Sequence, residues 1–155
     1  MTAPQPAVAG KKKPPNARHR ARQFVLQGLY QALVGGQDQA AIVAQAADVA
    51  GFDKADRGLY QRLLQTTLDD AAVLQEDLVA HLDRPWDEVS PIERGILLIG
   101  ACELRNFPET PYRVVLNEAI ELAKSYGGTD GHRFVNGVLD KLAVILRPHE
   151  TGRSG

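Results

Sequence analysis

The sequence predicts an all-α protein of about seven helices. Among its 155 residues 44% are hydrophobic, mostly Ala, Leu and Val, while only 6% are aromatic, a composition that favours helices over sheets. Apolar residues recur at helical spacings of three and four, and no segment alternates as a strand does. Capping residues, prolines and glycine pairs divide the periodic segments from one another.

The chain is expected to begin with a disordered tail, residues 1–15, because MTAPQPAVAGKKKPP is rich in Pro, Ala and Lys and has no periodicity. Asn16 then caps a first helix that ends at Gly35-Gly36. The apolar residues of this helix keep to one side, as in a helix packed on a core: they are 21, 24, 25, 28, 29, 32 and 33.

The next two helical segments are predicted at residues 39–50 and 54–82. Asp38 precedes the shorter one and Gly51 follows it, as cap and stop. The longer segment keeps helical spacing of its leucines, but polar residues weaken its middle and favour a bend. These residues are Thr66-Thr67 and Asp69-Asp70.

A loop is expected at RPWDEV, residues 84–89, and a strong helix start follows it. Ser90 is the predicted N-cap, Pro91 suits the first helical position, and Glu93 completes a capping box. The helix should run to about residue 105.

The last two helices are predicted from the same kind of signals. Thr110 and Pro111 repeat the cap-and-proline device and begin a helix that reaches Tyr126. After a glycine pair, Asp130 is expected to cap a final helix over residues 131–146.

The predicted organisation is one helical domain, residues 16–147, followed after Arg147-Pro148 by a disordered tail, residues 148–155. The longest apolar run is about eight residues, too short to span a bilayer, and the N-terminus lacks the apolar segment of a signal peptide. Cys102, the single cysteine, lies in an apolar run and is expected to be buried. We therefore expect a cytoplasmic protein without membrane association.

Charge is distributed unevenly along the chain. Residues 1–22 carry six basic side chains and no acidic one, whereas the remainder carries 12 basic and 19 acidic ones. A +6 end on a −7 body favours a polyanionic partner at that end, although a solubilising tail would look the same. The six are Lys11, Lys12, Lys13, Arg18, Arg20 and Arg22.

No sequence pattern indicates catalysis. Nucleotide-binding glycine loops, HExxH, GxSxG and CxxC are absent, and the four histidines are scattered without metal-ligand spacing. Neighbouring acids such as Asp69-Asp70 point in different directions on a helix, which favours a solvated face over an acid/base pair. We expect a binding protein, with neither metal nor cofactor.

The first candidate binding surface is the start of the first helix. On a helical wheel, a polar stripe lies beside the apolar arc and consists of His19, Gln23, Gln27 and Tyr30. Arg20 lies at its outer edge, whereas Arg18 and Arg22 lie over the apolar arc and are expected to overhang the core or snorkel around it. Arginines bind phosphates and a ring stacks on bases, so the stripe suits single-stranded RNA; the alternative is an ordinary amphipathic helix.

The second candidate surface is SYGGTDGHRFVNG, residues 125–137. Its glycines allow close backbone approach, and basic or imidazole side chains surround it: Lys124, His132 and Arg133. Asp130 is either a helix cap or an acceptor for a base amino group. Phe134 is either a core residue or a surface ring on which a base can stack.

Two segments together resemble the NusB family of bacterial transcription antitermination factors: ARHRARQFVLQGLY and PYRVVLNEAIELAKSYGGTDGHRFVNGVLDKLA. The resemblance extends over residues 16–147, although residues 37–88 match only in helical pattern. It implies a fold of two small helical bundles packed together. It also implies a factor without enzymatic activity that binds RNA.

The resemblance further implies a function. Such factors bind boxA-type single-stranded RNA of ribosomal RNA operons with the ribosomal protein NusE, and support read-through by RNA polymerase. The implied RNA contacts are Arg18, Arg20, Arg22, Tyr30, Asp130 and Phe134. Glu93 matches a position facing the protein partner, and His19 stands where relatives often have a third arginine.

Three points stay open at this level. The chain could instead be an accessory module of a ribosomal RNA methyltransferase-type system, or a pure protein-interaction module. The sequence does not distinguish a monomer from a homodimer. The Lys11–Lys13 tail either adds phosphate attraction or has no role.

Overall fold

The computed structural model describes residues 16–152, which form helices joined by short connections, with no strand in that range. The expectation of a disordered tail over residues 1–15 concerns residues outside this range. The described elements are α1 (Ala17–Gly35), α2 (Gln39–Ala47), η1 (Phe52–Lys54), α3 (Arg57–Asp69), α4 (Ala71–Val79), η2 (Trp86–Glu88), α5 (Pro91–Asn106), α6 (Tyr112–Tyr126), α7 (Gly131–Leu146) and α8 (Pro148–Thr151).

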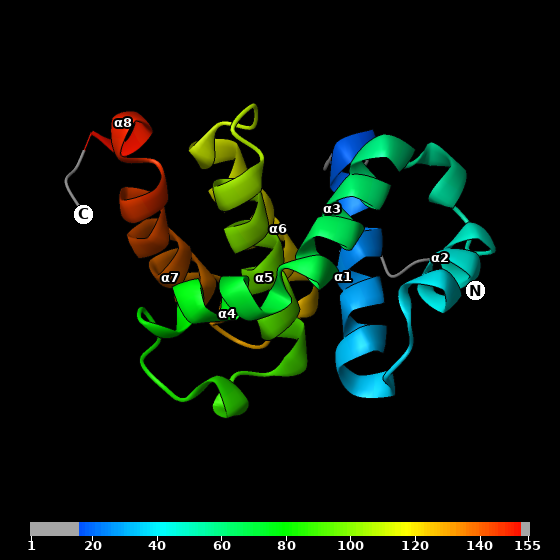
Figure 1. The fold of residues 1–155 in the computed structure, drawn as a ribbon, viewed down its shortest axis with the longest axis horizontal. Coiled ribbons are helices and arrows are strands. Elements are labelled where there is room, and N and C mark those ends of the chain that lie inside the picture. Colours follow the sequence, from blue (N-terminus) through cyan, green and yellow to red (C-terminus); the bar gives the residue numbers. More distant parts are fainter. Residues whose placement is uncertain (1–15, 153–155) are drawn as a thin grey trace.

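The helices form two bundles, which confirms the predicted architecture. Figure 1 shows α1, α2 and α3 in one half of the molecule and α4 to α7 in the other. Helix α5 joins the halves because it packs against α1 and α3 as well as against α4, α6 and α7. Leu97 and Ile96, on α5, are fully buried at this junction, so one apolar core runs through both bundles.

Three predicted N-caps are confirmed by their hydrogen bonds. The side chain of Asn16 accepts from the His19 amide at 2.7 Å, and that of Asp38 accepts from the Ala41 amide at 2.9 Å. Ser90 Oγ accepts from the Glu93 amide at 3.2 Å. These bonds satisfy amides that have no partner within their own helices.

The predicted bend in the third helical segment is confirmed as a break. Helix α3 ends at Asp69 and α4 begins at Ala71, with Asp70 between them at φ −100° and ψ 10°. The preceding residues 52–54 form the separate turn η1, and the expected loop at residues 84–89 contains the turn η2. Each of η1 and η2 is a single helical turn, too short to show a hydrophobic periodicity in the sequence.

The predicted cap at Thr110 is wrong. Helix α6 begins at Tyr112 without a side-chain cap from its own N-terminal neighbours. The Tyr112 amide instead donates to Glu150 Oε1 at 2.9 Å. Glu150 belongs to α8, so the expectation of a disordered tail from residue 148 is also wrong as far as residue 152.

Helix α5 shows how closely the helices of the second bundle pack. A Cβ on Gly100 would lie 2.5 Å from Leu139 Cδ1, so a glycine is needed where α5 crosses α7. Cys102 is fully buried on the same helix, as expected, and burial raises the pKa of its thiol. Across residues 16–152, no helix has the length and apolarity needed to cross a membrane.

Candidate nucleic-acid interface

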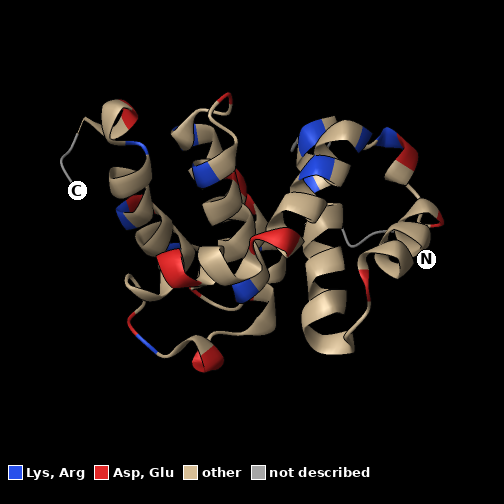
Figure 2. Ribbon diagram, in the orientation of Figure 1, with Lys and Arg blue, Asp and Glu red and all other residues tan. Residues whose placement is uncertain are grey.

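The N-terminal end of α1 presents exposed positive charge. Figure 2 shows basic residues gathered at this end of α1 and on the adjoining chain that leads into α3. Arg18 is exposed and Arg20 is partly exposed, as a phosphate contact requires. Lys54 and Arg57 are exposed on the adjoining segment. We call these four residues the basic end.

Lys54 and Arg57 were not predicted from the sequence because they lie more than 30 positions from Arg20 along the chain. A backbone hydrogen bond brings the segments together: the Asp56 amide donates to Ala17 O at 3.0 Å. Asp53 adds one exposed acid to this segment, so positive charge still predominates at the surface. A contact between residues so far apart along the chain leaves no local pattern in the sequence.

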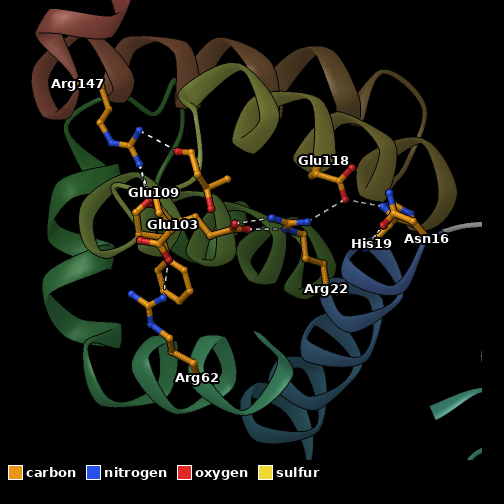
Figure 3. A network of polar contacts seen from close by, with 10 residues as sticks. Asn16, His19, Arg22, Arg62, Glu103, Glu109, Glu118 and Arg147 are labelled. Carbon is orange, nitrogen blue, oxygen red and sulfur yellow. Dashed lines mark hydrogen bonds and ion pairs between the residues drawn. The ribbon is translucent and has the colours of Figure 1, made fainter. Parts of the chain in front are cut away.

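Arg22 corrects the sequence-based expectation, because its guanidinium is inside the protein. Its side chain is 2% exposed and pairs through two nitrogens with Glu103 of α5, at 2.8 Å from Nε to Oε2 and 2.7 Å from Nη2 to Oε1. Nη1 also lies 3.3 Å from Glu118 of α6 (Figure 3). Arg22 therefore holds α1 against the second bundle and is removed from the phosphate-binding set.

The predicted polar stripe of α1 is only partly at the surface. Gln23 is 2% exposed, and neither Gln23 nor Gln27 has a hydrogen-bond partner for Nε2 among the described residues. His19 Nδ1 lies 2.7 Å from Glu118 Oε1 of α6, so the first turns of the stripe face the second bundle. Tyr30 alone keeps substantial exposure, at 41%.

Tyr30 is displaced from the basic end along the same helix. Ten residues separate it from Arg20, which corresponds to about 15 Å at the rise of an α-helix. A ligand that contacts both must therefore be extended. Single-stranded RNA satisfies this requirement, because its backbone and unstacked bases can follow a helix surface.

The connection between α6 and α7 carries the second predicted site. Asp130 has φ 63°, the one left-handed residue other than glycine between residues 16 and 152. It makes no side-chain cap, so the capping prediction is wrong. Its carboxylate lies 3.9 Å from Arg133 Nε, and both side chains are largely exposed.

Glu93 supports this connection from beneath. It is 9% exposed, and Oε2 accepts from the Gly128 amide at 3.3 Å. A Cβ on Gly131 would lie 2.4 Å from the same oxygen, so a larger residue there would displace the Glu93 carboxylate from its present position. The Glu93 carboxylate is thus bound to the loop between α6 and α7. It neither completes the predicted capping box nor presents the surface expected of a partner-facing acid.

Phe134 packs on the core and also carries a charged side chain of the protein on its ring. It is partly buried and packs against the core, while the guanidinium carbon of Arg84 lies 4.2 Å from the centroid of its ring. Nearby, Lys124 is half exposed and Arg133 is 79% exposed, whereas His132 is partly buried. In Figure 1 α1 begins near the top of the molecule, whereas the connection between α6 and α7 lies in its lower half.

The contact between His19 and Glu118 predicts an acid-sensitive stability. Burial would raise the pKa of Glu118, but the hydrogen bond with His19 and the charges of His19 and Arg22 outweigh burial and hold it below 4.5. A lowered folded-state pKa stabilises the protein above the unfolded-state value, and that stability is lost as pH falls through the folded-state value.

Glu118→Gln should therefore lose less stability than the natural protein between about pH 5 and about pH 3. Urea unfolding at a series of pH values measures the difference, and all other carboxylates are common to both proteins. If the free energies of unfolding of the two proteins changed in parallel with pH, the lowered folded-state pKa of Glu118 would be contradicted.

The fold and these surfaces together define an all-α, two-bundle protein with a surface suited to nucleic acid. The chain belongs to the NusB family, whose family model matches residues 19–144. It is 55% identical over 140 residues to the transcription antitermination protein NusB of Dechloromonas aromatica (strain RCB), covering 90% of this chain and 86% of that one. It is 58% identical over 135 residues to NusB of Azoarcus sp. (strain BH72), covering 86% and 87%.

Solved structures share the fold. A structure of T. maritima NusB superposes with a TM-score of 0.72 at 26% identity, covering 85% of this chain and 92% of that one. A chain in a crystal structure of the antitermination factors NusB and NusE with double-stranded RNA superposes with a TM-score of 0.71 at 21% identity, covering 82% and 96%. The two-bundle arrangement is therefore common to these chains.

Proposed function

We propose that this protein is a transcription antitermination factor that binds boxA-type single-stranded RNA of ribosomal RNA operons together with the ribosomal protein NusE. The complex supports read-through by RNA polymerase. Family membership over most of the chain supports the proposal, as do relatives named transcription antitermination protein. A structural neighbour of the same fold is a complex with NusE and RNA.

The observation that carries the proposal is the exposure of a phosphate-binding end and an aromatic ring on one helix. Arg18 and Arg20 would hold phosphates, and Tyr30 would stack on a base. Asp130 would accept from a base or shape the loop, and Phe134 would stack on a second base. His19, Lys124 and Arg133 would adjoin the RNA without carrying specificity.

The protein acts without catalysis in this proposal. Its proposed contacts are of the kind that bind RNA. NusE would approach a surface separate from the basic end, so that RNA and protein partner bind together. Neither Glu93 nor Arg22 offers its charge to that partner, because both are buried.

Tyr30→Ala should weaken binding to boxA-type RNA by about 1–3 kcal/mol, the cost of one lost base stack. Fluorescence anisotropy with a boxA-type RNA and a scrambled RNA, with and without NusE, measures the loss. Tyr30→Phe is the matched control, since it keeps the ring and should keep the affinity. Equal binding of both RNAs by the natural protein, at every salt concentration, would reject the proposed function itself.

A further inference from the structure

A hollow of about 200 Å³ lies beside Phe134, between the chain that follows α4 and the exposed side of α7. The residues from α7 that form its apolar side are Phe134, Gly137 and Val138. His81 and Asp83 face them from the chain after α4. The hollow is open to solvent and is joined at Phe134 to the loop that carries Asp130.

Gly137 has no explanation within the protein. A Cβ at this position would meet no described atom within 4 Å, and its φ is not left-handed. An exposed glycine inside a helix costs about 1 kcal/mol relative to alanine. Neither packing nor backbone geometry requires this glycine, and its exposed backbone is accessible to a close approach by something outside the chain.

The rim of the hollow is mainly basic. Lys141 is exposed one turn beyond Gly137, and Arg133 is 79% exposed one turn before it. Asp83 is the acid of the lining, and Arg84 engages it at 2.7 Å from Nε to Oδ1. The hydrogen bond from Arg84 is the main cause that lowers the pKa of Asp83, and Lys141 lowers it further. Asp83 thus has two cations beside it, Arg84 and Lys141.

A planar cation already lies on the Phe134 ring. The guanidinium of Arg84 lies 4.2 Å from the ring centroid, a cation–π distance. The side chain of Arg84 is 38% exposed, so the group can move. A planar base of similar thickness can take this stacking position, or stack on the outer side of the guanidinium.

We propose that this hollow is a nucleotide subsite for the RNA: the base lies against Phe134 and the bare backbone of Gly137, and its phosphate meets Lys141 and Arg133. The proposal rests on the proposed function and extends it from Phe134 along α7 to Gly137 and Lys141, which are not among the RNA contacts that the family resemblance implies. One apolar side, formed by α7, together with a basic rim fits a nucleotide better than an acidic or apolar peptide, because a nucleotide combines one flat face with one anion.

Gly137→Leu tests the subsite without changing charge. Open space at this position lets the side chain enter the hollow, and replacing a helical glycine favours folding. Binding of boxA-type RNA should weaken about tenfold, as for the loss of one stacked base. Gly137→Ala is the small control and should bind more nearly like the natural protein.

Lys141→Ala tests the phosphate contact. Affinity should fall about fivefold, and the slope of log K against log salt should become shallower by about 0.7 for one lost contact with a single strand. Arg113→Ala is charge-matched; Arg113 is exposed at the start of α6 and lines a different hollow on the other side of α7. Equal losses for both variants would overturn the subsite in favour of general electrostatic attraction.

Two outcomes separate this inference from the function on which it rests. If the natural protein binds boxA-type RNA specifically and Gly137→Leu does not change that binding, the subsite is wrong while the function stands. If Gly137→Leu weakens only assembly with NusE, the face belongs to the protein partner and the subsite is again wrong.

A direct probe is AMP, compared with ribose 5-phosphate, followed by amide NMR shifts of the full chain. We expect shifts at Phe134, Val138 and Lys141 with AMP and markedly smaller ones with the base-free phosphate. Equal shifts with the two probes would overturn base binding in the hollow.

Discussion

Replacing Arg22 with alanine is expected to destabilise the fold by about 3–5 kcal/mol, the usual cost of breaking one side of a buried ion pair. Arg22 and Glu103 are 2% and 1% exposed, and two hydrogen bonds join them. Without the guanidinium, the Glu103 carboxylate would stay buried and uncompensated. The loss should appear as a lower midpoint in urea or thermal unfolding.

The matched control is Lys124→Ala, which removes a cation from an exposed pair. Lys124 Nζ lies 3.8 Å from Glu121 Oε2, and both side chains are about half exposed. Such pairs contribute about 0–1 kcal/mol. A stability change for Arg22→Ala no larger than that of the control would contradict the structural role.

A double replacement, Arg22→Met with Glu103→Leu, should recover much of the loss. Apolar residues of similar volume commonly replace a buried pair at no cost, because neither charge then has to leave water. Glu118 would keep its contact with His19 in this variant. Recovery would show that Arg22→Ala destabilises the protein because the buried Glu103 carboxylate is left unpaired, and not because the shape of the site has changed.

Arg22 explains part of the unusual charge of the first helix. Its bonds to Glu103 and Glu118 attach α1 to two helices of the second bundle (Figure 3). Arg18 and Arg20, on the neighbouring turns, are left at the surface. The arginine-rich start therefore has two roles: one residue fixes the helix in place, and its neighbours form the basic end that the RNA would contact.

Local features of this fold could be predicted because their causes are local. The caps at Asn16, Asp38 and Ser90 depend on a side chain and an amide three residues later. The end of α1 depends on Gly36, whose φ of 66° suits glycine. The break near Asp70 follows from polar residues with weak helix propensity.

Features set by distant contacts could not be predicted. Arg22 looks like a surface arginine until Glu103, 81 positions away, is seen beside it. Gln23 belongs to a polar stripe on the wheel, yet it is buried. Glu93 fits a capping box by spacing, but Gly128 takes its carboxylate. In each case the sequence pattern lacked the distant element that contacts or covers the side chain.

Arg147 shows the same limit at the other end of the chain. An Arg-Pro pair predicts only that a helix stops, yet Arg147 is 8% exposed and donates to four backbone carbonyls. These are Leu104 O at 2.8 Å, Thr110 O and Glu103 O at 3.0 Å, and Phe107 O at 2.9 Å. The last carbonyls of a helix lack partners within it, so one guanidinium satisfies the end of α5 and the turn before α6.

Arg147→Ala should therefore destabilise the protein by about 3 kcal/mol or more, since several buried acceptors lose charge-assisted bonds together. Arg147→Lys keeps the charge but not the planar fork, and should recover only part of the loss. Glu150 also joins α8 to the start of α6, because its carboxylate accepts from the Tyr112 amide. Glu150→Ala should therefore destabilise the protein by about 1 kcal/mol, as for a lost helix cap. Denaturant unfolding measures all three. If Arg147→Lys were as stable as the natural protein, positive charge alone would suffice at the end of α5, and the multidentate geometry would not be what holds it.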